Sequence, residues 1–320
     1  MQEPGVKVKE PLARSNFTLT ANDGAQLFVY RWLPLAPAKV VVQIVHGLAE
    51  HGARYARLAQ ALNQKGYAVY ANDHRGHGRT AKTSEELGFL AEREGWRKCI
   101  DDLWLLNQRI ADDHSRAPVI LLGHSMGSTM AREFITEHGD ALAGVVLSGP
   151  NGQPPAIALL GRIIARFERL RLGRRGHSRL IHNLTFAAFN KPFAPARTPF
   201  DWLSRDPAEV DKYVADPLCG FPASVQLWIE LLGAWKRVST KTAYGRVPRN
   251  LPLLVMAGEH DPVSAGTRQL GPMLRAYRTA GLRDVEDRIY PGARHEIFNE
   301  TNRDQVTNDL IAWMHRVAGR

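Results

Sequence analysis

Ser125 has the clearest chemical potential of any residue in this chain. It stands at the centre of the run Gly123-His124-Ser125-Met126-Gly127, a G-x-S-x-G pattern that follows the apolar run Pro118–Leu122. Apolar residues then recur at four-residue spacing from Met126 to Phe134, which is typical of a helix. A serine on a sharp turn between a strand and a helix is strained, and flanking side chains would collide with it, so glycines are expected on both sides. The pattern predicts a nucleophile, with a plain glycine-rich turn as the alternative.

A base must accept the serine proton before the alcohol becomes a good nucleophile, so we expect a histidine downstream of Ser125. Among the 12 histidines, His295 lies in a loop after the expected strand Val285–Tyr290 and before the last expected helix. Such loops at the carboxyl edge of a parallel sheet gather ligands and catalytic groups. His295 is therefore the predicted base, and an ordinary surface histidine is the alternative.

The acid that orients the base is expected between the two in sequence, because α/β sheets with this serine turn use the order Ser, acid, His. The run Gly258–Pro262 follows the expected strand Leu253–Ala257 and contains two carboxylates, Glu259 and Asp261. Asp261 is favoured because its later position lets the chain turn over toward His295. An Asx turn is the alternative role for Asp261.

Two amide donors are needed to stabilise a tetrahedral oxyanion. The first is the N–H of Met126, at the dipole-positive start of the expected helix. The second is expected from the loop after the strand Val40–Val45, where Gly47 lets the backbone curl toward the serine and Leu48 N–H can donate. A metal bound by the two histidines of this loop is disfavoured, because no further ligand cluster accompanies them. Neither a metal nor a cofactor is expected.

Three segments carry a resemblance to a known family: His46–Tyr55, Asp73–Gly78 and Gly123–Gly127. Over roughly Phe17–Val317 the chain resembles α/β-hydrolases of the monoacylglycerol lipase and lysophospholipase group, more weakly in the middle. The resemblance implies an α/β-hydrolase fold, with a mostly parallel twisted sheet, helices on both faces and an inserted helical cap. It implies a serine ester hydrolase that needs no cofactor and cleaves a small lipid or ester substrate, with Asp261 and His295 as acid and base.

The resemblance also suggests residues that contact the substrate. Glu50 and Arg54 would line a polar pocket for the alcohol part of the ester, and His124 is a further candidate. An ion pair that fixes the oxyanion loop is an equal alternative for Glu50 and Arg54. Other reactions of the fold, by an aminopeptidase, thioesterase or perhydrolase, are alternative functions. A ligand-binding protein without turnover is disfavoured, because all three triad candidates are present.

The chain is expected to divide into a flexible arm, a core and an insertion. The arm covers residues 1–14, and the α/β core covers residues 15–148 and 251–320. Between the two parts of the core, residues 149–250 contain no clear strand, and this interval is far longer than an ordinary connection between two elements. This interval is expected to form a helical cap over an apolar tunnel.

The net charge of +10 comes mainly from one segment, since Gly161–Arg179 contains seven arginines and one acid, Glu168. No nucleic-acid-binding signature accompanies this charge, so nucleic acid is not expected as a partner. One face of the expected helix Ile157–Leu170 carries apolar residues, and the opposite face carries arginines: Ile157, Leu160, Ile164 and Phe167 against Arg162, Arg166 and Arg169. Such a helix could dock onto an anionic membrane, and the alternative is that its apolar face packs on the core and its arginines are solvated.

The expected location is cytoplasmic, with peripheral contact to a membrane through the basic cap. No apolar stretch of the 320 residues is long enough for a membrane span, and Met1–Arg14 lacks the apolar core of a signal peptide. Cys99 and Cys219 have no metal-type spacing, and both are interpreted as reduced packing residues. The sequence contains no signal for an oligomeric state.

Overall fold

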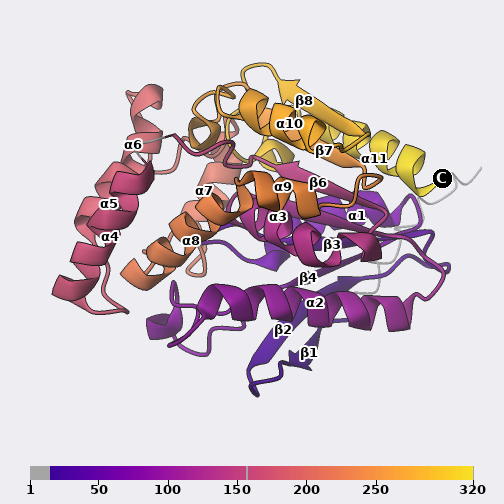
Figure 1. The fold of residues 1–320 in the computed structure, drawn as a ribbon, viewed down its shortest axis with the longest axis horizontal. Coiled ribbons are helices and arrows are strands. Elements are labelled where there is room, and N and C mark those ends of the chain that lie inside the picture. The colour runs from indigo at the N-terminus through magenta and orange to yellow at the C-terminus, as the bar shows by residue number, and fades with distance from the viewer. Residues whose placement is uncertain (1–14, 156–157, 320) are drawn as a thin grey trace, which may run out of the picture.

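A single sheet of eight strands forms the centre of the computed structural model, which describes residues 15–155 and 158–319. The arm expected over residues 1–14 lies outside these ranges. The strand order is β1-β2-β4-β3-β5-β6-β7-β8 (Figure 1). The strands are β1 (Phe17–Thr20), β2 (Gln26–Trp32), β3 (Val40–Val45), β4 (Tyr67–Asn72), β5 (Val119–His124), β6 (Gly144–Ser148), β7 (Leu253–Gly258) and β8 (Val285–Tyr290).

Most of the sheet is parallel. The six strands β4-β3-β5-β6-β7-β8 run in one direction, and β2 joins this group through an antiparallel pairing with β4. Strands β3 to β7 are buried along their whole length, and their apolar runs suit strands that are covered on both faces. The loops after β3, β5, β6, β7 and β8 consequently meet at one edge of the sheet. The predicted fold class is confirmed.

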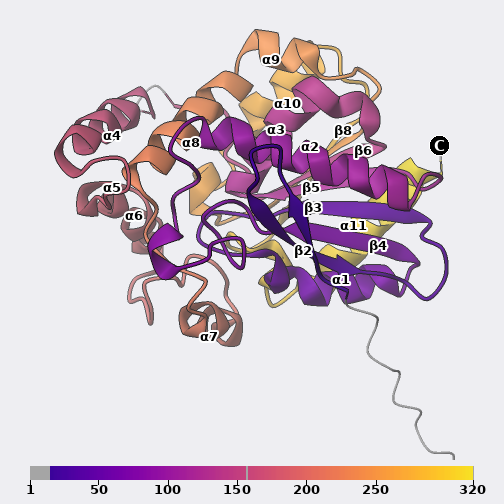
Figure 2. The same ribbon diagram turned by 90° about the horizontal axis from the view of Figure 1, so that it is seen from below.

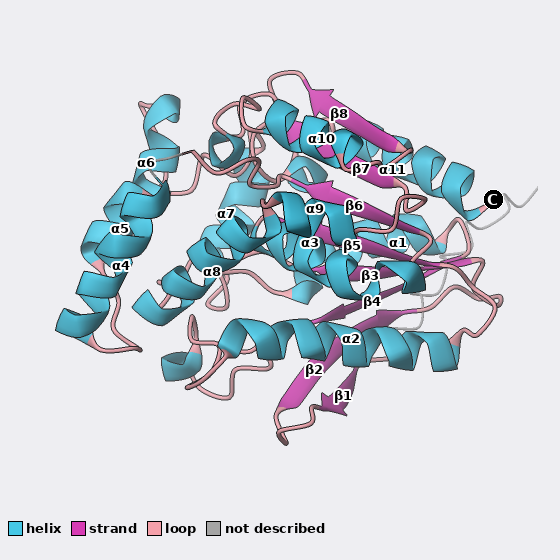
Figure 3. Cartoon of the chain, viewed as in Figure 1, coloured by secondary structure: helices cyan, strands magenta, loops and turns pink. Residues whose placement is uncertain are grey.

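Helices cover the sheet on both faces (Figures 2 and 3). One apolar core lies between the sheet and the helices on its first face, and a second core lies on the opposite face. The first face carries α2 (Gly95–Asp113), α3 (Met126–His138), α8 (Val225–Val238), α9 (Lys241–Arg246) and α10 (Leu270–Thr279). The second face carries α1 (Ala56–Asn63) and α11 (Arg303–Ala318).

Helices without any strand fill the interval between β6 and β7, within the described residues. Its first four helices are α4 (Ala158–Leu172), α5 (Arg179–Leu184), α6 (Phe186–Asn190) and α7 (Pro207–Ala215). Helices α4, α5 and α6 stand beyond the carboxyl ends of the parallel strands (Figure 1). The last two, α8 and α9, turn back and pack against α3.

Arg132 of α3 is buried, with 1% of its surface exposed, although no carboxylate faces it among the described residues. Its guanidinium instead donates to the carbonyl oxygen of Asn151, 3.0 Å away, and to that of Val238, 3.2 Å away. It also donates to the hydroxyls of Ser239 and Tyr244. Buried hydrogen bonds to a charged group are among the stronger ones, so Arg132 joins α3 to both ends of the interval between β6 and β7.

Helix α4 exposes apolar side chains and half-buries arginines. Leu160 is 51% and Phe167 68% exposed, whereas Arg162 and Arg169 are half-buried. The Arg169 guanidinium donates to Gln226 of α8. The alternative in which the apolar face of this helix packs on the core and its arginines are solvated is therefore wrong for these four residues, although Ile164 is half-buried against the core and Arg166 is exposed. Ile157, also assigned to that face, lies outside the described residues.

Six exposed apolar side chains of α4 and α5 make up what we call the apolar stripe: Leu160, Ile163, Phe167 and Leu170 of α4 with Leu180 and Leu184 of α5. Its α4 members follow each other at three- and four-residue steps, so they share one helical face. No helix in the described part of the chain combines the length and the apolar character that a membrane span requires.

Candidate active site

Ser125 occupies a strained turn between β5 and α3. Its φ of 52° is positive, which is uncommon for a residue with a side chain. A Cβ added to Gly127 would lie 2.0 Å from the carbonyl oxygen of Val45, and one added to Gly123 would lie 2.4 Å from that of Gly127. Neither site can hold a side chain unless the backbone moves. The steric reason expected for the two glycines is confirmed.

His295 and Asp261 are in direct contact. His295 Nδ1 lies 2.9 Å from Asp261 Oδ1, and both side chains are buried. The same carboxylate oxygen accepts the backbone N–H of Val263, which fixes its orientation. Glu259, the competing acid, is exposed and accepts the N–H of Gly292 instead. The geometry thus brings Asp261, and not Glu259, to the candidate base.

The pKa of His295 is raised above its ordinary value. Burial by itself lowers this pKa, but the negative charge of Asp261 and its hydrogen bond outweigh burial. The imidazolium form is therefore stabilised in a place where water is excluded. A base that must hold a proton during a reaction requires this property.

Three neighbours position the imidazole of His295; the sequence interpretation missed two of them, Trp202 and Gly149, and named His124 only as a candidate for substrate contact. The ring of Trp202 lies 5.0 Å and that of His124 lies 4.7 Å from it, between centroids. A Cβ added to Gly149, which has a φ of 52°, would lie 3.0 Å from two ring atoms of His295. Gly149 directly follows β6 at the edge that carries the candidate residues, and that position was a signal available in the sequence.

One cavity brings the candidate residues together. Ser125 and His295 line it, and so do Leu48 and Met126, the expected amide donors. The remaining wall is largely apolar and comes mostly from the interval between β6 and β7: Phe186, Phe189, Trp202, Leu203, Tyr213, Trp228 and Leu231, with Val263 from the core. The arrangement presents a hydroxyl and an imidazole to an apolar ligand.

Glu50 and Arg54 form part of an ion-pair network. Glu50 Oε1 accepts the N–H of Gly47 at 2.5 Å, and Glu50 Oε2 lies 2.9 Å from Arg54 Nη1. Arg54 also makes a bidentate pair, at 2.5 and 2.7 Å, with Glu296, the residue after His295. Although burial opposes it, Arg54 lowers the pKa of Glu296. The network therefore connects the loop after β3 with the loop that carries the candidate base.

The polar candidates differ in what they reach. Glu50 and His124 line the cavity of Ser125, and both also line a neighbouring cavity. Arg54 lines only the neighbouring one of these two cavities. Glu296 lines both and was missed in the sequence.

Three buried histidines, His46, His74 and His77, pack against one another where the loop after β3 begins. His46 Nε2 accepts the N–H of His74, and His46 Nδ1 donates to the carbonyl oxygen of Gly47. His77 Nδ1 donates to the carbonyl oxygen of Arg75. Burial lowers the pKa of His46 well below its ordinary value, that of His74 to about 3 and that of His77 to about 4. These imidazoles are neutral structural groups.

The three histidines should make the protein sensitive to acid. Their pKa values are lower in the folded than in the unfolded state, so the unfolded chain binds more protons below about pH 6.5 and stability falls with pH. Each neutral histidine should lower the free energy of unfolding by about 2 kcal/mol at pH 5 relative to pH 8. The three together should lower it by about 6 kcal/mol, which is comparable with the whole stability of many domains. Urea unfolding followed between pH 8 and pH 5 measures this loss.

His295 acts in the opposite direction, because its pKa is raised and its contribution is lost as pH rises. A His260→Asn variant is the control, since His260 is exposed and should leave the slope unchanged. Unfolding free energies that are equal at pH 8 and pH 5 would contradict the neutral assignment.

Known proteins match this chain over most of its length. The model of the family described as serine aminopeptidase, S33, matches residues 36–302. The chain belongs to the S33 family. This S33 hydrolase is 30% identical to a monoacylglycerol lipase of Mycolicibacterium smegmatis, in a match that covers 94% of this chain and 97% of the relative. It is 28% identical to a human monoglyceride lipase, with 90% of this chain and 85% of that protein covered.

Solved structures agree with this family assignment. The S33 hydrolase is similar to a thermostable carboxyl esterase from Bacillus coagulans, with a TM-score of 0.87 and 26% identity over 96% of this chain and all of that one. A soluble variant of monoglyceride lipase from Saccharomyces cerevisiae shares the fold, with a TM-score of 0.73 and 21% identity over 96% of this chain and 98% of that one. The predicted resemblance to α/β-hydrolases of the monoacylglycerol lipase group is confirmed.

Proposed function

We propose that this S33 hydrolase is a serine carboxylic ester hydrolase that cleaves esters with a single apolar acyl chain, of the monoacylglycerol type. One observation carries the proposal: Ser125 and His295, whose ring is hydrogen-bonded to Asp261, line one largely apolar cavity. The monoacylglycerol lipases and the carboxyl esterase among the similar proteins support the same reaction.

In the proposed mechanism Ser125 Oγ attacks the ester carbonyl while His295 Nε2 accepts its proton. The N–H groups of Leu48 and Met126 donate to the oxyanion, and Asp261 stabilises the imidazolium. The proton then passes to the leaving alcohol as the C–O bond breaks, which gives an acyl-enzyme. Water attacks this ester with His295 again as base, and the fatty acid leaves while Ser125 regains its proton. The cycle requires no cofactor.

Peptide hydrolysis, which the name of the family suggests, has weaker support in the site. An aminopeptidase needs a free carboxylate to bind the ammonium group of its substrate. The carboxylates that line the cavity of Ser125 are those of Glu50 and Glu296, and both are paired with Arg54. An amine would have to displace a buried guanidinium, whereas a neutral glycerol group needs no charge partner.

Residues 149–250 are proposed as the cap that selects the acyl chain. The helices α6 and α8 contribute Phe186, Phe189, Trp228 and Leu231 to the cavity wall. Aromatic and leucine side chains recognise an alkyl chain through apolar burial, which is non-directional and increases with length. Specificity for chain length therefore resides in the interval between β6 and β7.

Longer acyl chains should be hydrolysed better than acetate. Each added methylene or two in an apolar pocket contributes about 1–3 kcal/mol to discrimination, so p-nitrophenyl octanoate should exceed the acetate in kcat/KM by at least about tenfold. Release of fatty acid from a 1-monoacylglycerol, measured with the same preparation, tests the proposed class of substrate. A profile that stays flat or falls from two to ten carbons would contradict an apolar acyl site, and faster cleavage of aminoacyl p-nitroanilides would favour the peptidase.

We also propose that the enzyme reaches its substrate at membranes through the apolar stripe. The stripe is exposed on α4 and α5, and the exposed Arg166 and Arg179 belong to the same two helices. Apolar burial in the headgroup region and attraction of arginines to anionic lipids act together, with about 1 kcal/mol for each arginine near the surface.

Vesicle flotation tests this contact. The enzyme should float with anionic vesicles, and less with neutral ones, at low salt, and Phe167→Ser with Leu170→Ser should reduce flotation on both. Arg166→Glu should remove the preference for anionic lipid, and Arg246→Glu on α9 is a charge-matched control away from the stripe. Equal partitioning of the wild type and the Phe167/Leu170 variant would overturn the proposed docking surface.

A further inference from the structure

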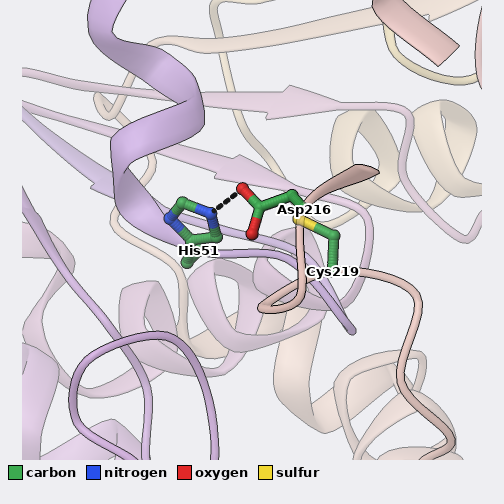
Figure 4. A group of neighbouring side chains, drawn as sticks. All are labelled: His51, Asp216 and Cys219. Atoms are coloured by element: carbon green, nitrogen blue, oxygen red, sulfur yellow. Dashed lines mark hydrogen bonds and ion pairs between the residues drawn. The ribbon is translucent and has the colours of Figure 1, made fainter. Parts of the chain in front are cut away.

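A second cluster of reactive side chains includes His51, a residue of the loop after β3 that also carries Leu48. Figure 4 shows the ring of His51 facing the carboxylate of Asp216, with Cys219 beside them. His51 Nε2 and Asp216 Oδ2 are 2.9 Å apart, and one donor atom from each of the three residues lies within 4.8 Å of the others. Imidazole nitrogen, carboxylate oxygen and thiolate sulfur are the three ligand types that bind Zn²⁺ in proteins.

The backbone holds the donors of this cluster in place. Asp216 Oδ1 accepts the N–H of Leu218, and the N–H of Cys219 donates to the carbonyl oxygen of Asp216. This tight turn places both side chains near His51. The carbonyl oxygen of Ala49 accepts the N–H of Gly220 and, at 2.9 Å, the hydroxyl of Tyr213, so the turn is fixed to the loop after β3.

The charges around the thiol favour a cation. Among the described residues, four charged groups influence the Cys219 thiol most. Three are the carboxylates of Asp216, Glu50 and Glu296, and the fourth is the guanidinium of Arg54. Taken together with Arg54, these carboxylates leave an excess of negative charge around the sulfur.

We propose that His51, Asp216 and Cys219 form a zinc site in which imidazole, carboxylate and thiolate bind Zn²⁺ and a water molecule completes a tetrahedron. Bonds of about 2.0–2.3 Å place tetrahedral ligand atoms roughly 3.3–3.6 Å apart. The His51–Asp216 pair must therefore lengthen and Cys219 must move inward. Rotation of the side chains supplies both movements, and Asp216, with a side chain 31% exposed, gives access to solvent.

The proton balance of this step is defined. Zn²⁺ displaces the thiol proton of Cys219 to solvent, because a coordinating thiol is deprotonated by the metal. The ring hydrogen of His51 moves from Nε2 to Nδ1, an atom without a hydrogen-bond partner among the described residues. Binding should release about one proton per zinc ion. The metal would connect the loop after β3 with the segment after α7 and would raise the melting temperature.

The experiment uses the full chain, freed of metal by a chelator. Zinc titrated against a chromophoric chelator should bind at one ion per chain, and Co²⁺ in its place should give a thiolate-to-cobalt charge-transfer band. Cys219→Ser should abolish this band and weaken zinc binding by at least about tenfold. Removal of a residue that only supports a ligand already costs about tenfold or more in metal affinity, so removal of a ligand should cost no less. Calorimetry in buffers of different ionisation enthalpy measures the released proton.

The chain offers a matched thiol control, because Cys99 is its other cysteine and lies buried away from the cluster. Cys99→Ala should keep the cobalt band, and His260→Asn should keep zinc affinity. His51→Asn serves as a second ligand variant, and circular dichroism with ester hydrolysis verifies the fold of each metal-free protein. Absence of stoichiometric zinc in the wild type, or unchanged binding in Cys219→Ser, would overturn the site and leave His51 and Asp216 as a hydrogen-bonded pair.

Discussion

Ester hydrolysis by the Ser125→Ala protein should fall by a factor on the order of 10⁶ in kcat, as it does when the nucleophile of another triad is removed. The substitution deletes only the hydroxyl. Alanine and serine tolerate the positive φ of this turn about equally, so the fold should be kept. The release of p-nitrophenol from a p-nitrophenyl ester and the covalent labelling by a fluorophosphonate should both disappear.

Ser84→Ala is a suitable control for the nucleophile, because Ser84 is exposed and lies outside the cavity. This variant should react with the fluorophosphonate as fast as the wild type. A purified Ser125→Ala protein that still takes up the label, or still turns over ester, would show that another residue attacks the carbonyl. The zinc site would be untouched by that outcome, because its test measures metal binding.

Asp261→Asn should reduce kcat by about 10⁴, the loss found when the acid of a serine triad becomes an amide and the histidine adopts the wrong tautomer. It should also lower the pKa of His295, because the charge of Asp261 keeps that pKa high against burial. The acid limb of the profile of kcat/KM against pH should then move to lower pH. Rate profiles of the variant and the wild type, fitted with the same model, measure both effects.

Glu259→Gln is the matched control for Asp261→Asn, since it makes the same chemical change two residues earlier. Glu259 is exposed, accepts the backbone N–H of Gly292 and lies 4.0 Å from the exposed ring of His260, so its loss should leave kcat within about twofold, as a surface change usually does. If the Glu259 variant proved more damaging than the Asp261 variant, the two acids would exchange roles.

Local patterns were enough to predict the frame of the site. The strand Val285–Tyr290 has the expected bounds, and the strand that begins at Leu253 is one residue longer than expected. Buried parallel strands appear in sequence as short apolar runs, and the residues that follow them must lie at the same edge. This is why Asp261 and His295 could be paired from their positions alone, in contact at 2.9 Å.

Contacts between distant segments could not be predicted in this way. Arg54 and Glu296 are 242 positions apart, and His51 and Asp216 are 165 positions apart, so no spacing rule relates them. Helix α4 failed for another reason. Its periodicity predicts two faces but does not say which one contacts a neighbour. Helix α4 packs against α8; its small Ala165 is buried and two of its arginines are half-buried, whereas Phe167 is exposed.

The wall of the Ser125 cavity includes residues from a helix packed on α3 and from a helix farther out. The guanidinium of Arg132 holds Asn151 and Val238, so the segment between β6 and β7 is fixed to α3 at these two points. Trp228 and Leu231 belong to α8, which packs against α3, so we expect them to form a stationary wall. Phe186 and Phe189 belong to α6, one of the outlying helices, and we expect them to form an adjustable wall. Changes at the stationary wall should reset the preferred acyl length permanently, whereas changes at the adjustable wall should alter how fast ligands enter and leave.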